Sequence, residues 1–291
     1  MLSEKHKGGD LLARLKRLVA LAACLLSITI SENPIRAAPE AIMSVSGVAV
    51  SEENIAEYYP QGKAFTVCSL NVRAAPDSSS QVIRTLDQGE EVNVAVYSGD
   101  WAFLGDGYCY AGYLSSSWEP NGLRLSANSM EAAKYIGYAY SQFFTLPDAV
   151  LTRLEDYAIQ ITDSPIVDHY GQEGIEAVGR TYTDGKDNKM WLADSVEAMQ
   201  DTLIHESGHV LDHSGLLRDG LLYSEYDGFR DAYEKEQQDF SEFYNCLEYN
   251  IYSRQEYFAE SFKEYLSDGD TMKENFPQTY QFHKDLLEKL S

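Results

Sequence analysis

Residues 203–212 read LIHESGHVLD, and this stretch contains the pattern H-E-x-x-H at His205, Glu206 and His209. Upstream of it, Asp194 and Glu197 stand three residues apart, a spacing typical of the capping box that begins a helix. Apolar residues then recur at roughly helical spacing up to residue 210. The sequence therefore predicts a helix that begins near residue 194 and carries both histidines, four positions apart, on one face.

Two imidazoles one helical turn apart can bind the same metal ion. Glu206 follows the first histidine, and we expect it to be the general base that takes a proton from water. We expect Asp212 to support the ligands without binding the metal, and Gly208 to leave room for a chain that crosses the helix. His213 lies about 12 Å along the helix axis from His205, so we expect it to be solvated or at the helix end. The alternative is a pair of surface histidines on an amphipathic helix.

The third protein ligand that a catalytic zinc ion requires is expected from a later helix. Residues 249–266 read YNIYSRQEYFAESFKEYL, where Glu256 and Glu260 lie four positions apart on a partly apolar face. Two carboxylates on such a face are costly unless a cation compensates them. The alternative is an ordinary exposed acidic helix.

Three segments, HESGHVLD, QEYFAESF and FPQTYQFHKDLL, resemble the catalytic domain of anthrax lethal factor and its relatives, which include the secreted Pro-Pro endopeptidases of Gram-positive bacteria. The resemblance covers about residues 130–291 and implies a mainly helical α+β, zincin-like metalloprotease domain with one Zn²⁺ ion. It implies that Glu256 is the third zinc ligand, after the two histidines. It also implies that Tyr249 faces the reacting carbonyl, with Tyr252 as a competitor for that role. Glu260 is expected to hydrogen-bond a ligand imidazole.

Residues 62–118 read as short strands separated by turns, which predicts a small all-β barrel. Within them LNVRAAPDSSSQVIRTLDQGEEVNV resembles the bacterial Src homology 3 domain, with Tyr113 where that family usually has tryptophan. The resemblance implies attachment to peptidoglycan or another wall polymer. Cys68 and Cys109 lie in an early and a late strand, so a disulfide between them is the favoured prediction, and two buried free thiols are the alternative.

The predicted fold class is therefore multi-domain, a small all-β barrel followed by the mainly helical α+β domain. Breakers in residues 119–129 predict a linker between two separate folding units. In the second unit, Asp184 and Gly185 predict a hairpin between two strands. The later strand, in residues 189–194, is expected beside the metal-binding helix, either holding the substrate by strand addition or as an ordinary sheet edge.

The first 38 residues predict export. Arg14, Lys16 and Arg17 precede the uncharged apolar run of residues 18–30, which is typical of a signal peptide and too short to span a bilayer comfortably. The alternatives are lipidation at Cys24 and an uncleaved signal anchor. The net charge of −23 argues against a nucleic-acid partner. We therefore expect a secreted protein without stable membrane insertion after signal cleavage, with the cell wall as a candidate partner.

Together these features predict a secreted zinc-dependent endopeptidase that hydrolyses peptide bonds of extracellular or envelope proteins and is targeted to the cell wall by its β domain. The alternatives are a peptidoglycan cross-bridge hydrolase and a wall-binding protein with a degenerate metal domain. The intact histidines and glutamates of the predicted site count against the last of these.

Overall fold

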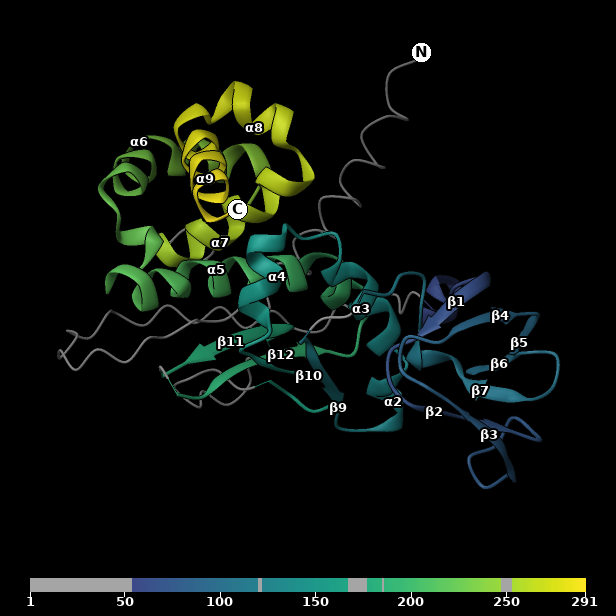
Figure 1. The fold of residues 1–291 in the computed structure, drawn as a ribbon. Coiled ribbons are helices and arrows are strands. Elements are labelled where there is room, and N and C mark those ends of the chain that lie inside the picture. Colours follow the sequence, from purple (N-terminus) through teal and green to yellow (C-terminus); the bar gives the residue numbers. More distant parts are fainter. Residues whose placement is uncertain (1–53, 120–121, 167–176, 185, 247–252) are drawn as a thin grey trace, which may run out of the picture.

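The computed structural model describes residues 54–119, 122–166, 177–184, 186–246 and 253–291. The predicted signal peptide with Cys24, and the candidate tyrosines Tyr249 and Tyr252, lie outside the described residues. None of the helices in the described ranges is both long and apolar enough to cross a bilayer. Figure 1 shows a β-rich unit beside a larger unit in which helices cover a sheet.

The β-rich unit is the small all-β region that the sequence predicts. Several of its strands bury alternate residues, as a sheet with one face on a core requires. In the strand Leu70–Arg73 the buried residues are Leu70 and Val72. The strands form two sheets, in the orders β4-β1-β8 and β3-β2-β7-β6-β5. Its elements are the short 3₁₀ helix η2 (Ile55–Tyr58), β1 (Gly62–Thr66), β2 (Leu70–Arg73), β3 (Val82–Leu86), β4 (Glu91–Val94), β5 (Val96–Ser98), β6 (Trp101–Phe103), β7 (Tyr108–Tyr110), the 3₁₀ turn η3 (Ala111–Tyr113) and β8 (Leu114–Ser115).

The cysteines of the β-rich unit are free, so the favoured disulfide between Cys68 and Cys109 is wrong. Cys109 lies in β7, opposite Ala102 of β6, and its side chain is buried in the larger sheet. Cys68 follows β1, which belongs to the other sheet. Burial raises the pKa of both thiols.

The second unit has one four-stranded sheet, in the order β11-β12-β10-β9, with helices on it. In Figure 1 α5 runs across the middle of this unit, with the sheet on one side and α6 to α9 on the other. The strands are β9 (Arg124–Ala127), β10 (Ala158–Thr162), β11 (Gly179–Thr183) and β12 (Asn188–Ala193). The helices are α2 (Met130–Ala133), α3 (Ile136–Phe143), α4 (Asp148–Leu154), the π-helical turn η4 (Ala198–Thr202), α5 (Leu203–Asp219), the 3₁₀ turn η5 (Tyr223–Glu225), α6 (Asp227–Tyr244), α7 (Arg254–Ser267), α8 (Gly269–Asn275) and α9 (Pro277–Leu290).

The first strand of this sheet lies inside the segment predicted as a linker. Residues 124–127 form β9, which pairs in parallel with β10 from Arg124 opposite Ala158 to Ala127 opposite Ile161. Directly after β9, the Asn128 side chain donates to Thr162 Oγ1 at 2.8 Å. The second unit therefore begins before residue 130, and the predicted linker is wrong over its second half.

The predicted hairpin around residue 184 is confirmed, because β11 and β12 pair antiparallel from Gly179–Leu192 to Thr183–Asn188. Its later strand does not lie at an edge, because β10 pairs with the other side of β12. A strand paired on both sides has no row of free backbone groups for a peptide. The predicted peptide-binding or edge position of residues 189–194 is therefore wrong, and among the described strands β11 and β9 form the edges.

The β-rich unit packs closely against α2 and α3 (Figure 1). Gly112 of η3 lies against the backbone of Ala133, and Gly137 of α3 lies against the backbone of Leu114. A Cβ atom at either glycine would overlap these backbone atoms. The two units therefore meet through backbone contacts that only glycine permits.

Side chains extend the same interface. Tyr110 Oη donates to the carbonyl oxygen of Met130 at 2.8 Å. Trp118 stacks on Tyr140 of α3, with ring centroids 5.3 Å apart. Val196, two residues before η4, is buried in the apolar core of the β-rich unit. This interface does not fit the predicted pair of separate folding units, because the core of one unit includes a residue of the other.

Candidate metal centre

The helix that carries the histidines begins with a side-chain cap followed by a π-helical turn. Ser195 Oγ accepts a hydrogen bond from the Ala198 N–H at 3.0 Å, which places the cap one residue after the predicted Asp194. The next turn, η4, is π-helical, with the Leu203 N–H donating to the Ala198 carbonyl. Single π turns within helices occur frequently at functional sites. The α5 helix then runs to a left-handed Gly220.

The two histidines of α5 face the interior and not solvent. His205, Glu206 and His209 are each at most 2% exposed, so the alternative of two surface histidines does not hold. They lie four positions apart on one helix, as the sequence predicts. A buried pair of imidazoles requires polar partners, and these come from α7.

The α7 helix crosses α5 at Gly208. A Cβ atom at Gly208 would lie 2.8 Å from Ala259 Cα, so the two helices approach as closely as they do because residue 208 has no side chain. This agrees with the predicted role of Gly208. The first turn of α7 is fixed by Ser253, whose Oγ accepts from the Glu256 N–H at 3.1 Å. The crossing brings Glu256 and Glu260, which flank Ala259, against the histidine face of α5.

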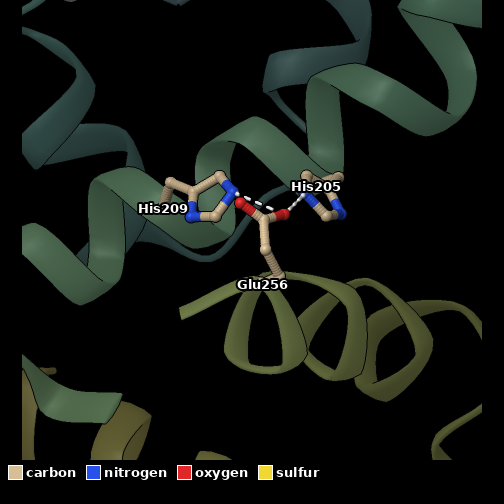
Figure 2. A group of neighbouring side chains, drawn as sticks. All are labelled: His205, His209 and Glu256. Carbon is tan, nitrogen blue, oxygen red and sulfur yellow. Dashed lines mark ion pairs between the residues drawn. The ribbon is translucent and has the colours of Figure 1, made fainter. Parts of the chain in front are cut away.

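Glu256 meets both histidines, so the alternative of an exposed acidic helix does not hold either. Figure 2 shows its carboxylate between the two rings. Its Oε2 lies 3.4 Å from His205 Nε2 and 3.5 Å from His209 Nε2. Within the described residues these three side chains form the one cluster of histidine, cysteine, aspartate or glutamate whose ligand atoms converge as a metal requires.

The spacing of these atoms fits a metal ion better than direct hydrogen bonds. Neither His205 Nε2 nor Glu256 Oε2 has a hydrogen-bond partner among the described residues, although both are buried. Zn–N and Zn–O bonds of about 2.0–2.2 Å in tetrahedral geometry separate neighbouring ligand atoms by about 3.4 Å. The observed separations of 3.4 and 3.5 Å match this value. The site therefore can hold a metal ion through His205, His209 and Glu256.

The charges of the site also favour a cation. Burial lowers the pKa of His205, but the carboxylates of Glu256 and Glu260 outweigh it and raise the pKa to about 10. Burial raises the pKa of Glu256, but the two imidazoles outweigh it and lower the pKa to about 2. Each shift reflects the same attraction, because the carboxylates stabilise the positive form of the imidazole and the imidazoles stabilise the negative form of the carboxylate.

Glu206 lies beside the ligands and is held through β11. Its backbone carbonyl accepts from Thr181 Oγ1 at 3.2 Å. Gly179 lies so close that an added Cβ would be 3.0 Å from Glu206 Cγ. Burial raises the pKa of Glu206, and its Oε2 has no hydrogen-bond partner among the described residues. Such a carboxylate is suited to accept and return a proton.

Glu260 hydrogen-bonds the imidazole of His205, one of the two histidines predicted to bind a metal. Its Oε2 lies 2.9 Å from His205 Nδ1. The other oxygen, Oε1, accepts from Lys263 Nζ at 2.6 Å and lies 4.0 Å from Cys246 Sγ. Lys263 is not among the residues predicted from the sequence. Its position three residues after Glu260, on the same helix face, is the signal that points to it.

Two other residues of α5 differ from their predictions. Asp212 is buried, but it accepts from the Ser224 N–H at 2.6 Å and from Ser224 Oγ at 2.8 Å. In the structure it therefore anchors η5, and these hydrogen bonds go to Ser224 instead of a ligand imidazole. His213 is buried inside α5, not solvated and not at its end. The prediction failed because α5 continues six residues beyond His213 under the loop that holds η5.

Known families match both halves of this architecture. Residues 188–286, which include both helices of the site, match the family described as Anthrax toxin lethal factor, N- and C-terminal domain. Residues 69–115 match the family described as Bacterial SH3 domain. Both resemblances seen in the sequence are therefore confirmed over these segments.

Among solved structures, the chain is similar to the PRO-PRO endopeptidase (PPEP-2) from Paenibacillus alvei. The two are 20% identical, the match covers 57% of this chain and 97% of that one, and the TM-score is 0.41. No curated protein matches the chain. The roles of individual residues therefore rest on the geometry of this chain.

Proposed function

We propose that the chain is a secreted zinc-dependent endopeptidase. One observation carries the proposal. Glu256 Oε2 lies 3.4 and 3.5 Å from the Nε2 atoms of His205 and His209, spacings that a tetrahedral zinc ion needs, and the buried Glu206 is adjacent in sequence. The match of residues 188–286 to the lethal factor family supports the same activity.

A zinc ion held by these three side chains would supply Lewis-acid chemistry for attack on a peptide carbonyl. Glu206 accepts the proton of the attacking water at Oε2 and passes it to the leaving amine. Glu260 accepts from His205 Nδ1–H, which fixes the ring so that Nε2 is free to be a ligand. We assign stabilisation of the developing oxyanion to Tyr249, as the resemblance implies.

The substrate peptide is proposed to pair with β11. This edge strand lies directly against Glu206 through Gly179 and Thr181. Among the described strands only β12 pairs with it, so an extended peptide can add to its other side by backbone hydrogen bonds. This arrangement replaces the predicted role of residues 189–194.

The substrate class is proposed to be extracellular or envelope proteins near the cell wall. The match of residues 69–115 to the bacterial SH3 family supports wall attachment. The same match supports the second candidate function, a hydrolase of peptidoglycan cross-bridges. Release of soluble peptides from purified wall by the wild-type protein, and not by Glu206→Ala, would favour that second function.

A peptide-library cleavage profile tests the proposed activity. The wild-type protein should cleave a defined subset of peptides, and a zinc chelator should abolish cleavage. Glu206→Ala should lose activity by at least about a hundredfold, as expected for a general base, and should keep its zinc. Cleavage by Glu206→Ala at the wild-type rate would exclude this residue as the base.

A further inference from the structure

Lys263 is the buried cation nearest to the metal centre. Among the described residues it is the only lysine or arginine that is buried. Its side chain is 11% exposed, and Nζ donates to Glu260 Oε1 at 2.6 Å. A lysine loses its hydration when it is buried, so its position requires a carboxylate partner.

Glu260 joins this lysine to the metal site. One of its oxygens accepts from Lys263 Nζ, and the other lies 2.9 Å from His205 Nδ1. The side chain of Glu260 is 2% exposed. Lys263 therefore acts on His205 through one carboxylate and contacts no ligand directly.

The buried charges explain why a lysine is needed. Glu206, Glu256 and Glu260 are all buried where α5 and α7 cross. One divalent ion balances two of these carboxylates, and Lys263 supplies the remaining positive charge. Asp212, another buried acid of α5, is bound by Ser224, and burial raises its pKa to about 7, so it carries less negative charge at neutral pH.

Glu264 is the other carboxylate near Lys263. Its Oε1 lies 3.5 Å from Nζ, against 2.6 Å for Glu260, and its side chain is 17% exposed. The shorter contact and deeper burial identify Glu260 as the main partner of Lys263.

We propose that Lys263 is a positioning residue of the metal centre, which holds the Glu260 carboxylate oriented as the acceptor for His205 Nδ1–H. With that proton fixed on Nδ1, the His205 Nε2 lone pair faces the metal. The inference rests on the proposed zinc site and deepens it, because it names the group that compensates the outer carboxylate.

Zinc affinity tests the proposal without using activity. Lys263→Met keeps the length of the side chain and removes its charge. Competition with a chromophoric chelator should show that zinc affinity falls, by up to about the 10- to 100-fold that losing Glu260, the direct partner of His205, would cost. Lys263→Arg restores the charge and should bind zinc within a few-fold of wild type. The matched control is Lys284→Met, because Lys284 is exposed and lies 3.7 Å from Glu288 at the surface of α9.

Glu260→Gln provides the second arm. Without the Glu260 carboxylate, Lys263 has no link to His205, so Lys263→Met in this background should not weaken zinc binding further. The double variant removes both charges together, so its zinc affinity can be compared with that of Glu260→Gln even if Lys263→Met alone does not fold. A further tenfold loss in the double variant, or wild-type zinc affinity in Lys263→Met, would overturn the proposal.

These outcomes are distinct from failure of the proposed function. If the wild-type protein binds no zinc, the metal site itself is wrong. If the wild-type protein binds zinc and cleaves peptides while Lys263→Met keeps full zinc affinity, only the role of Lys263 is wrong.

Discussion

The close crossing of α5 and α7 predicts that one methyl group at Gly208 disturbs the metal site. In Gly208→Ala the new Cβ would lie 2.8 Å from Ala259 Cα. Carbon atoms in contact need about 3.5–4.0 Å, so α7 must retreat by roughly 1 Å. Glu256 lies one turn before Ala259 on the same helix and moves with it. Its Oε2 would then lie more than about 4 Å from the imidazoles, whereas metal–ligand distances tolerate shifts of about 0.2 Å.

The expected result is a loss of zinc affinity of tenfold or more and a loss of about 1–3 kcal/mol in the free energy of unfolding of the metal-free protein, as for an overpacked core. Gly228→Ala in α6 is the matched control. There the nearest atom to the new Cβ would be Phe282 Cδ2 at 3.6 Å, an ordinary contact. That variant should gain up to about 1 kcal/mol from helix propensity.

Chelator competition and denaturant unfolding measure both quantities. If Gly208→Ala binds zinc as tightly as wild type and is as stable as Gly228→Ala, the helix crossing does not set the geometry of the site.

Three further predictions concern other parts of the chain. Deletion of residues 54–118 should lower the thermal unfolding midpoint by about 10 °C or more, because losing the interface with α2 and α3 costs at least about 3 kcal/mol. Circular dichroism measures this midpoint, and an unchanged value would support two separate folding units. Tyr249→Phe should lower kcat by roughly a hundredfold with unchanged zinc content, since an oxyanion donor acts in the transition state. Tyr252→Phe should be nearly silent, and a large loss in that variant alone would transfer the role to Tyr252. Burial lowers the pKa of His283 to about 3, so unfolding takes up a proton, and the folded state should lose about 1.4 kcal/mol per pH unit as pH falls below about 6.5. Denaturant unfolding at pH 7 and pH 5 should show a shallower loss in His283→Leu, and equal slopes would contradict the buried neutral imidazole.

The sequence predicts the α5 side of the site well because the spacing of residues within one helix determines it. His205 and His209 lie four positions apart, and a helix places such residues on one face whatever surrounds it. The role of Gly208 follows from the same helix. The contribution of Glu256 could be foreseen only through the family resemblance, because no local pattern tells which acidic residue a second helix will bring to the metal.

The errors of the sequence analysis concern contacts between distant segments. Arg124–Ala127 form a strand only because they pair with residues 158–161, more than 30 positions away. His213 is buried by the loop that holds η5, which the periodicity of α5 does not reveal. Cys109 lies in a strand of the larger sheet of the small unit, whereas Cys68 lies after β1, a strand of the other sheet. Lys263 looks like a surface lysine until Glu260 is known to be buried.

Zinc content of Glu256→Ala beside Glu260→Ala tests the central claim most directly. Both variants remove one buried carboxylate from α7, but only Glu256 has an oxygen at ligand spacing from both imidazoles. After dialysis, metal analysis by mass spectrometry should find one zinc ion per chain in the wild-type protein and almost none in Glu256→Ala. Glu260→Ala should retain zinc, with an affinity reduced by about 10- to 100-fold. Equal zinc retention in Glu256→Ala and wild type would contradict the assignment of His205, His209 and Glu256 as the metal site.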